Sequence, residues 1–179
     1  MTVIKKPFYF MKVAELTAEN STCTKKGVGA VLVREGKILA TGYNGAPSGV
    51  EHCTEKTCLR RLVRDNQHRE LCRGCHAEVN TIIQCAIHGT QIGEEAVIYC
   101  THFPCMSCAK LIINAKIKSI IFLNDYEMDN IEKMKILTQS PIEVYRFTWI
   151  SKENNKFTLK PYDTKERWFK LEEDFRRAF

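Results

Sequence analysis

The chain has 179 residues, of which 44% are hydrophobic and 27% are charged, and this composition suits one compact domain and excludes wholesale disorder. No window contains the roughly 18 unbroken apolar residues of a membrane-spanning helix, and the N-terminal stretch lacks the apolar region and cleavage site of a secretory signal. We therefore expect a cytoplasmic protein that does not contact a membrane. The net charge of +6 permits an anionic partner but does not identify one.

The first half of the chain predicts a helix, a hairpin and a long polar segment. Apolar residues recur at helical spacing within residues 7–20, after a proline that suits a first helical turn. Two β-rich runs follow at 28–33 and 37–43, separated by a turn. Residues 44–74 are polar and rich in cysteine, and a segment of that length in a compact domain needs something to hold it. We expect a metal to hold it.

The second half alternates between helix and strand. Its patterns predict a helix from 76 to 89, a strand at 96–102, a helix at 104–115 and a strand at 118–123. This alternation predicts a largely parallel sheet with helices on both faces. The pattern weakens beyond residue 125, where we expect a helix at 127–138, strands within 142–150 and 156–162, and a charged helical tail from Thr164.

Nine cysteines are many for such a chain, but the number is odd and they gather beside histidine and glutamate. Metal or thiol chemistry therefore explains them better than a disulfide framework. The runs CHAE and PCMSC each begin a predicted helix and contribute His76, Cys105 and Cys108. A catalytic zinc takes three such ligands and leaves one position open. Two cysteines three apart in a first helical turn can direct both sulfurs to one ion, and the helix dipole favours their thiolates.

Glu78 lies two residues after the histidine. As a fourth ligand it would close the open position, so we interpret it as the proton carrier beside the metal and its water. Each half of the pattern alone is more often structural, because CxxC occurs in zinc knuckles and redox pairs and a lone histidine in caps and cores. The two halves together, with Pro104 before Cys105, favour a catalytic zinc site.

The combined pattern resembles the signature of the zinc deaminases, H-x-E followed by P-C-x-x-C. In that chemistry zinc lowers the pKa of a water molecule, which attacks the carbon bearing an exocyclic amine. The resemblance implies that Glu78 takes the water proton, protonates the ring nitrogen and helps ammonia leave.

Four further runs narrow the resemblance to the deoxycytidylate (dCMP) deaminase family: STCTKKGVGAVLV, ATGYNGAPSGVEHC, ELCRGCHAEVNTIIQCAIHG and IYCTHFPCMSCAKLIINAKIKSIIF. Deaminases of tRNA adenosine, guanine or riboflavin precursors share the zinc motif, but we do not expect GYNGAPSG and a cysteine-rich insert in them. The resemblance implies a three-layer α/β/α sandwich with a central mixed five-stranded sheet. We expect one domain over 1–179, with a core at about 8–126, the insert at 44–74 and a C-terminal extension at 127–179.

For this family the resemblance implies hydrolysis of dCMP to dUMP and ammonia, which supplies the thymidylate precursor. It also implies activation by dCTP with Mg²⁺, inhibition by dTTP, and a hexamer. In the GYNG turn, the resemblance implies that Asn44 contacts the substrate and that Gly42, Tyr43 and Gly45 contact a nucleotide. A plain turn that ends a hairpin would explain these residues too. Tyr126 carries over as a substrate contact, with ordinary packing as its alternative.

The family places a polar run and the following basic residues near the substrate phosphate. Here Ser21 and Lys25 match that segment, together with Thr22, Thr24 and Lys26. Asn20 stands where we would expect arginine in many relatives, and the two lysines could also be plain surface residues.

Four other cysteines suggest a second, structural zinc. Some family members bind one with residues of the insert and of the turn between the first predicted helix and the hairpin, which we call the first turn. The candidates are Cys23, Cys53, Cys58 and Cys72, with His68 or His52 able to replace one of them. Their alternative is that they are buried free thiols.

Two functions of other classes stay open. A deaminase of a base within nucleic acid would suit the basic charge but needs a groove with stacking aromatic residues, so we expect no nucleic-acid partner. A non-catalytic zinc module has no need of Glu78.

Overall fold

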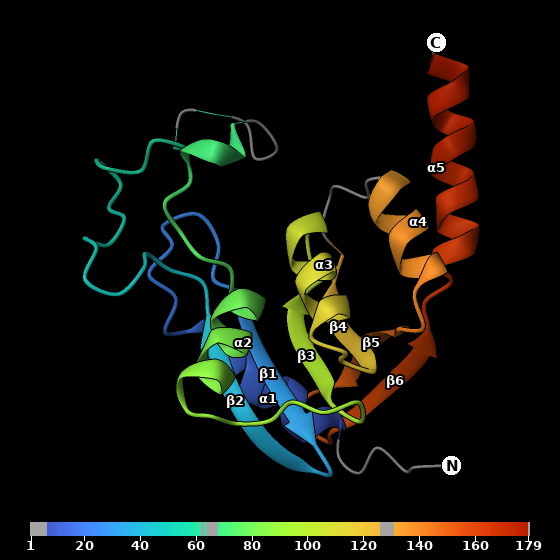
Figure 1. Cartoon of the computed structure of the whole chain (residues 1–179), viewed down its shortest axis with the longest axis horizontal. Coiled ribbons are helices and arrows are strands. Elements are labelled where there is room, and N and C mark those ends of the chain that lie inside the picture. The colour runs from blue at the N-terminus through green and yellow to red at the C-terminus, as the bar shows by residue number, and fades with distance from the viewer. Residues whose placement is uncertain (1–6, 62, 64–67, 126–130, 179) are drawn as a thin grey trace.

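A six-stranded mixed sheet forms the centre of the computed structural model, which describes residues 7–61, 63, 68–125 and 131–178 (Figure 1). The strand order across the sheet is β2-β1-β3-β4-β5-β6. The strands are β1 (Gly29–Arg34), β2 (Lys37–Tyr43), β3 (Val97–His102), β4 (Ser119–Asn124), β5 (Glu143–Ser151) and β6 (Lys156–Pro161).

The expected count of five strands was wrong by one. As a fifth and last strand, β5 would leave an edge of unpaired backbone groups, which proteins commonly cover. Here β6 returns from a hairpin and pairs antiparallel with β5, and Phe157 stacks on Phe147 with ring centroids 5.0 Å apart. The sheet is also less parallel than the helix and strand alternation suggested, because β3, β4 and β5 run parallel whereas β1, β2 and β6 are joined antiparallel.

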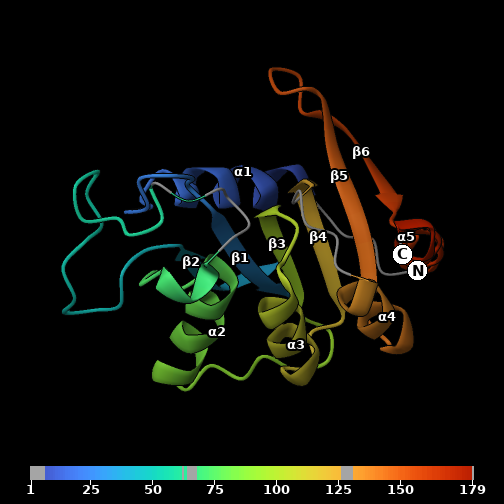
Figure 2. The ribbon, with the colours of Figure 1, turned by 90° about the horizontal axis from the view of Figure 1, so that it is seen from above.

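Helices cover both faces of the sheet, as the three-layer expectation required (Figure 2). Helix α1 (Pro7–Ala18) lies on one face, and α2 (Ala77–Ile87), α3 (Met106–Asn114) and α4 (Ile131–Gln139) lie on the other. Strand alternation divides the core accordingly, since successive side chains point to opposite faces. In β1, Val31 packs in the cluster beneath α1, whereas Leu32 packs in the cluster beneath the other helices.

The C-terminal extension continues this architecture. Helix α5 (Thr164–Ala178) packs against α4 at the end of the sheet. The β5–β6 hairpin reaches along α1, where Glu15 accepts hydrogen bonds from the Trp149 indole at 3.2 Å and from Lys152 at 2.6 Å. Residues 131–178 therefore complete the sheet and its helical layer.

The cysteine-rich insert lies apart from the sheet and has little regular structure beyond the short 3₁₀ helix η1 (Arg69–Leu71) (Figure 1). Its two ends meet, because Gly45 and Cys75 form an isolated antiparallel bridge with N···O distances of 2.8 and 3.2 Å. The insert thus leaves and re-enters the domain at one point beside α2. In the described part of the chain, no helix is long and apolar enough to cross a membrane.

Candidate metal centre and active site

Two helix starts bring the three predicted zinc ligands together. His76 immediately precedes α2 and Cys105 immediately precedes α3, both with extended backbone and without a side-chain capping bond. Their side chains are thereby left available for another role. Cys108 lies one turn into α3, on the same side as Cys105.

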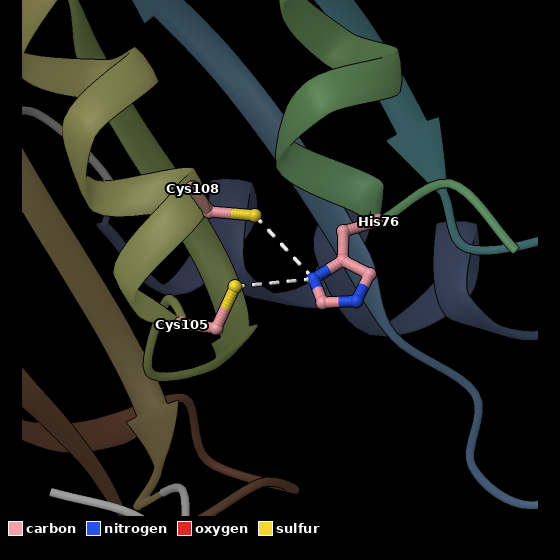
Figure 3. A group of neighbouring side chains, drawn as sticks. All are labelled: His76, Cys105 and Cys108. Atoms are coloured by element: carbon pink, nitrogen blue, oxygen red, sulfur yellow. Dashed lines mark hydrogen bonds between the residues drawn. The ribbon is translucent and has the colours of Figure 1, made fainter. Parts of the chain in front are cut away.

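The three side chains converge on one point (Figure 3). His76 Nδ1 lies 3.4 Å from the sulfur of Cys105 and 3.4 Å from that of Cys108, and the three ligand atoms lie within 4.8 Å of one another. Ligands of one tetrahedral zinc, with bonds of about 2.1 Å to nitrogen and 2.3 Å to sulfur, stand about 3.5 Å apart. One nitrogen and two sulfurs at this spacing fit a zinc ion.

The electrostatics of the two thiols agree with that interpretation. The pKa of Cys105 is lowered to about 3, first because Cys108 donates a hydrogen bond to its sulfur and further because His76 lies beside it. The pKa of Cys108 is correspondingly raised, because its proton is the one that the pair shares. The lowered pKa of Cys105 favours its thiolate, the form that binds metals.

Glu78 lies on the first turn of α2 and is only 4% exposed. Burial raises the pKa of its carboxyl group, while its own backbone hydrogen bond, the nearby His76 and a hydrogen bond from Cys108 act in the opposite direction. A buried carboxyl group with a raised pKa takes up a proton more readily than an exposed one, as a proton carrier must.

A pocket of about 210 Å³ opens onto this centre. Its wall includes His76, Glu78 and Cys105 at one part, and side chains of the first turn, the GYNG turn and the insert elsewhere. The pocket is also lined by Lys25, Lys26, Asn44, Gly45, His102 and Phe103, together with Cys23, Cys53, Cys58 and Cys72.

Asn44 lines the pocket, but its side-chain amide is occupied within the protein. Its Oδ1 accepts hydrogen bonds from Ser21 Oγ at 2.6 Å and from the Val28 amide at 2.8 Å, and its Nδ2 donates to the Lys26 carbonyl at 2.8 Å. Ser21, the other predicted contact, therefore bonds Asn44, and it does not line the pocket. The pair holds the first turn against the GYNG turn.

The glycines of the GYNG turn make close backbone approaches. A Cβ on Gly42 would lie 2.5 Å from the Ala77 carbonyl oxygen and from Thr81 Oγ1, so this glycine lets β2 pack directly on α2. Gly45 lies on the pocket wall and its backbone pairs with that of Cys75. Tyr43 is 42% exposed, and its carbonyl oxygen accepts a hydrogen bond from Asn80 Nδ2 at 2.7 Å. The turn thus sets the position of the helix that carries His76 and Glu78.

Lys25 and the four insert-related cysteines border the same pocket. The Lys25 ammonium donates to the carbonyls of Arg60 and Val63 at 3.2 and 3.3 Å, which ties the first turn to the insert. Burial, and then the neighbouring Cys58 thiol, raise the pKa of Cys53, with smaller contributions of the same sign from Cys72 and Cys23. The four thiols therefore face one another, although no three of them lie within the 4.8 Å that the catalytic trio shows among the described residues.

The remaining predicted residues are placed less centrally. His68 is exposed and its Nδ1 lies 3.0 Å from Glu70, and His52 is also exposed. Tyr126 lies outside the described residues.

Sequence reasoning missed two pocket residues, His102 and Phe103. They lie at and just after the end of β3, directly before Pro104 and Cys105, and no motif or apolar periodicity marks them as pocket residues. Phe103 is 2% exposed and stacks on Phe122 at 4.5 Å, and the buried Lys133 lies 4.3 Å above its ring. The position of His102 directly before the metal motif was the available signal.

Comparison with known proteins gives the family. The family model described as "Cytidine and deoxycytidylate deaminase zinc-binding region" matches residues 4–124. The chain belongs to this deaminase family. The match covers the metal centre, Glu78 and the insert, and it ends at the last residue of β4.

Curated relatives within the family are identical to this chain at about two fifths of the aligned residues. It is 36% identical over 141 residues to deoxycytidylate deaminase of Saccharomyces cerevisiae, covering 79% of this chain, and 41% identical over 119 residues to ComE operon protein 2 of Bacillus subtilis, covering 66%. The alignments span 44% and 59% of those two proteins, so the chain matches about half of their length.

A solved structure shares the fold of this deaminase domain. The dCMP deaminase of cyanophage S-TIM5, in complex with dCMP and dUMP, superposes with a TM-score of 0.63 at 31% identity. The superposition covers 78% of this chain and 94% of the phage protein.

Proposed function

We propose that this protein is a zinc-dependent hydrolase that converts dCMP and water to dUMP and ammonia, supplying the precursor of thymidylate. The observation that carries the proposal is the arrangement of His76, Cys105 and Cys108 within 4.8 Å, beside the buried Glu78, at a pocket. The substrate is proposed from relatives named deoxycytidylate deaminase and from the phage enzyme bound to dCMP and dUMP.

His76, Cys105 and Cys108 would hold the ion. When bound, zinc supplies the Lewis acidity that activates a water molecule at neutral pH. A nitrogen and two sulfurs leave one of four tetrahedral positions open, which a hydrolytic site requires and a closed structural site does not. The CxxC pair spans the first turn of α3, so the positive end of that helix stabilises both thiolates.

Glu78 moves the protons in this scheme. Its carboxylate accepts a proton from the attacking water and delivers it to the ring nitrogen of cytosine, next to the carbon that gains the oxygen. It then takes the remaining proton of the new hydroxyl group and passes it to the exocyclic amine. The C–N bond breaks, ammonia leaves, and the carbon–oxygen bond becomes the carbonyl of dUMP. The raised pKa of the buried carboxyl group suits this alternation, because burial makes the carboxylate a better proton acceptor than an exposed glutamate.

Substrate contacts follow as part of the proposal. Asn44 and Lys25 line the pocket, and we keep both as predicted substrate contacts, with Ser21 holding the Asn44 side chain in place. Tyr126 stays a predicted substrate contact. Gly42, Tyr43 and Gly45 stay predicted nucleotide contacts, for an effector as well as for substrate.

A second, structural zinc at Cys23, Cys53, Cys58 and Cys72 is also proposed. Two observations support it. The four cysteines line one pocket, and Cys58, Cys72 and Cys23 each raise the pKa of Cys53, so they lie close enough to interact with it. The ion would close the insert onto the first turn. His68 remains a possible substitute ligand by sequence, and its exposed side chain favours the four-cysteine set.

Regulation, assembly and location complete the proposal as family properties. They are activation by dCTP with Mg²⁺, inhibition by dTTP, a hexamer, a single domain over residues 1–179, and a cytoplasmic site of action.

The experiment that tests the function is ammonia release by the zinc-loaded protein from dCMP, with CMP, deoxycytidine, guanine and single-stranded DNA as competing substrates. We expect selective turnover of dCMP, increased by dCTP with Mg²⁺ if the regulation is present. Turnover of another substrate alone would overturn the substrate assignment, and silence on all of them, with zinc bound, would favour a binding module.

The matched control is Glu78→Gln, which keeps the shape and removes the carboxylate. We expect turnover to fall by about 10²- to 10⁴-fold, while zinc content measured by metal analysis stays the same. Loss of zinc in this variant would mean that Glu78 is a ligand.

A further inference from the structure

His102 ends β3 directly before the metal motif, and its ring forms part of the pocket wall. No role was assigned to it by sequence. Its ring atoms lie beside Thr101, whose Oγ1 is 3.1 Å from His102 Nδ1. The hydrogen bonds around that hydroxyl group decide which ring nitrogen carries the proton.

Thr101 is only 4% exposed, so its hydroxyl group depends on protein partners. The Gly29 amide donates to Thr101 Oγ1 at 3.1 Å, which uses one lone pair of the oxygen. Among the described residues, His102 Nδ1 is the neighbour of this oxygen that can accept the hydroxyl proton, since the Gly29 amide is a donor. His102 Nδ1 is therefore an acceptor, and its proton is on Nε2.

The imidazole is also held neutral. Burial, and then the nearby Lys26 ammonium, lower the pKa of His102 to about 4. At neutral pH the ring thus offers one N–H donor, on Nε2, and in the described part of the chain that donor has no protein acceptor.

Lys26 differs from its neighbour in what its side chain does. The Lys25 ammonium is engaged by the carbonyls of Arg60 and Val63, whereas the Lys26 side chain lines the pocket near His102 and has no acceptor among the described residues. Its backbone carbonyl is fixed by Asn44 Nδ2 at 2.8 Å, which sets where the side chain starts.

We propose that His102 and Lys26 together bind the 5′-phosphate of the nucleotide substrate, with His102 acting as a neutral N–H donor and Lys26 as the cation. A phosphate oxygen needs both hydrogen-bond donors and positive charge, and charge-assisted donors are the stronger ones. The inference rests on the proposed nucleotide substrate. Within the run that the resemblance places near the phosphate it selects Lys26 over Lys25 and Ser21, and it adds His102, which that run does not contain.

The first test compares dCMP with deoxycytidine, which lacks the phosphate. For His102→Leu we expect kcat/KM on dCMP to fall about 10-fold or more, since a hydrogen bond to a charged group is lost, mainly through KM. Turnover of deoxycytidine stays at the wild-type level. His102→Gln restores an uncharged donor and recovers part of the loss, and His88→Leu, at the exposed end of α2, is the matched control. An equal loss on both substrates would overturn the proposal, because it would place His102 at the base or in the fold.

Lys26→Gln should give the same selective loss for dCMP, with Lys37→Gln on the exposed β2 as its control. An unchanged KM for dCMP in Lys26→Gln would also overturn the proposal.

A binding measurement separates this inference from the proposed function. The side-chain NMR resonances of His102, identified by their absence in His102→Leu, should shift in zinc-loaded protein on addition of dUMP or inorganic phosphate, and not of deoxyuridine. This readout needs no turnover. A shift without dCMP deamination would sink the proposed function and keep the phosphate site, whereas deamination without a phosphate-dependent shift would do the reverse.

Discussion

The two groups of candidate metal ligands in this protein differ in how far the fold has assembled them. His76, Cys105 and Cys108 stand at the starts of α2 and α3 and converge to within 4.8 Å. Cys23, Cys53, Cys58 and Cys72 border one pocket, but they lie on the first turn and the insert, outside helices and strands.

The difference teaches what regular structure contributes to a metal site. The sheet holds α2 and α3 side by side, so their first turns meet whether or not an ion is present. A loop has no such support, because ordering each of its residues costs roughly 1–2 kcal/mol of backbone entropy that few buried contacts offset. We infer that the core site is preorganised, and that the insert depends on its metal.

The largest expected effect is on the core site. Cys105→Ala should remove the catalytic zinc and lower dCMP turnover by at least about 100-fold, while the melting temperature of the metal-free protein changes little, since the cluster is built by the sheet. Metal analysis, ammonia release and thermal unfolding check this. Cys75→Ser, which alters the neighbour of His76, should keep its zinc; if it does not, the ligand set is wrong.

The second effect is on the insert. Cys58→Ala should lower the zinc content from two ions to one and expose residues 44–74 to proteolysis, because a structural zinc contributes about 10–16 kcal/mol of binding free energy to folding its site. The core should stay resistant and keep its own zinc. Zinc stoichiometry and mass spectrometry of the fragments measure this. An insert as resistant as in the wild type would abolish the contrast between the two groups.

A smaller effect tests the support beneath the core site. Gly42→Ala places a Cβ about where the Ala77 carbonyl and Thr81 lie, 2.5 Å away, so β2 and α2 must separate. Overpacking of this kind costs about 1–3 kcal/mol, and we also expect weaker zinc binding because α2 carries His76. Lys37→Ala, on the same strand but exposed, should do neither. Denaturant unfolding and zinc titration compare the two variants.

The smallest effect concerns pH. Burial raises the pKa of Glu78 above its ordinary value of 4.5, so the folded metal-free protein holds this proton more tightly than the unfolded chain. Stability from this group is present below about pH 4.5 and is lost as the pH rises through the raised folded value, at up to about 1.4 kcal/mol per pH unit. Glu78→Gln should remove this slope. Parallel pH profiles in the metal-free proteins would contradict the buried position of Glu78.

Most secondary structure was predictable because each element carries a local pattern. The hairpin expected at 28–33 and 37–43 is β1 and β2, and the helix expected from residue 76 is α2, which begins at Ala77. The run at 156–162 was also predicted as a strand and is β6, so the count of five, which came from the family resemblance, was wrong where the local patterns were right. That β6 pairs with β5 in the same sheet is a tertiary fact.

The site shows the same division. His76, Glu78, Cys105 and Cys108 were predicted because the spacing of a metal motif on helix starts is local information. Asn44 was predicted to contact substrate, whereas its amide bonds Ser21, Val28 and Lys26, and such a network is visible only once the first turn and the GYNG turn lie together.

The sequence by itself therefore determined the candidate metal ligands, the proposed proton carrier and the order of helices and strands, since each rests on residue types at short spacing. Only the tertiary structure decided that, of two lysines that both line the pocket, Lys25 donates to carbonyls of the insert while Lys26 lies near His102. Neighbouring lysines are alike in sequence, and what separates them is which distant carbonyls lie within reach of each ammonium group.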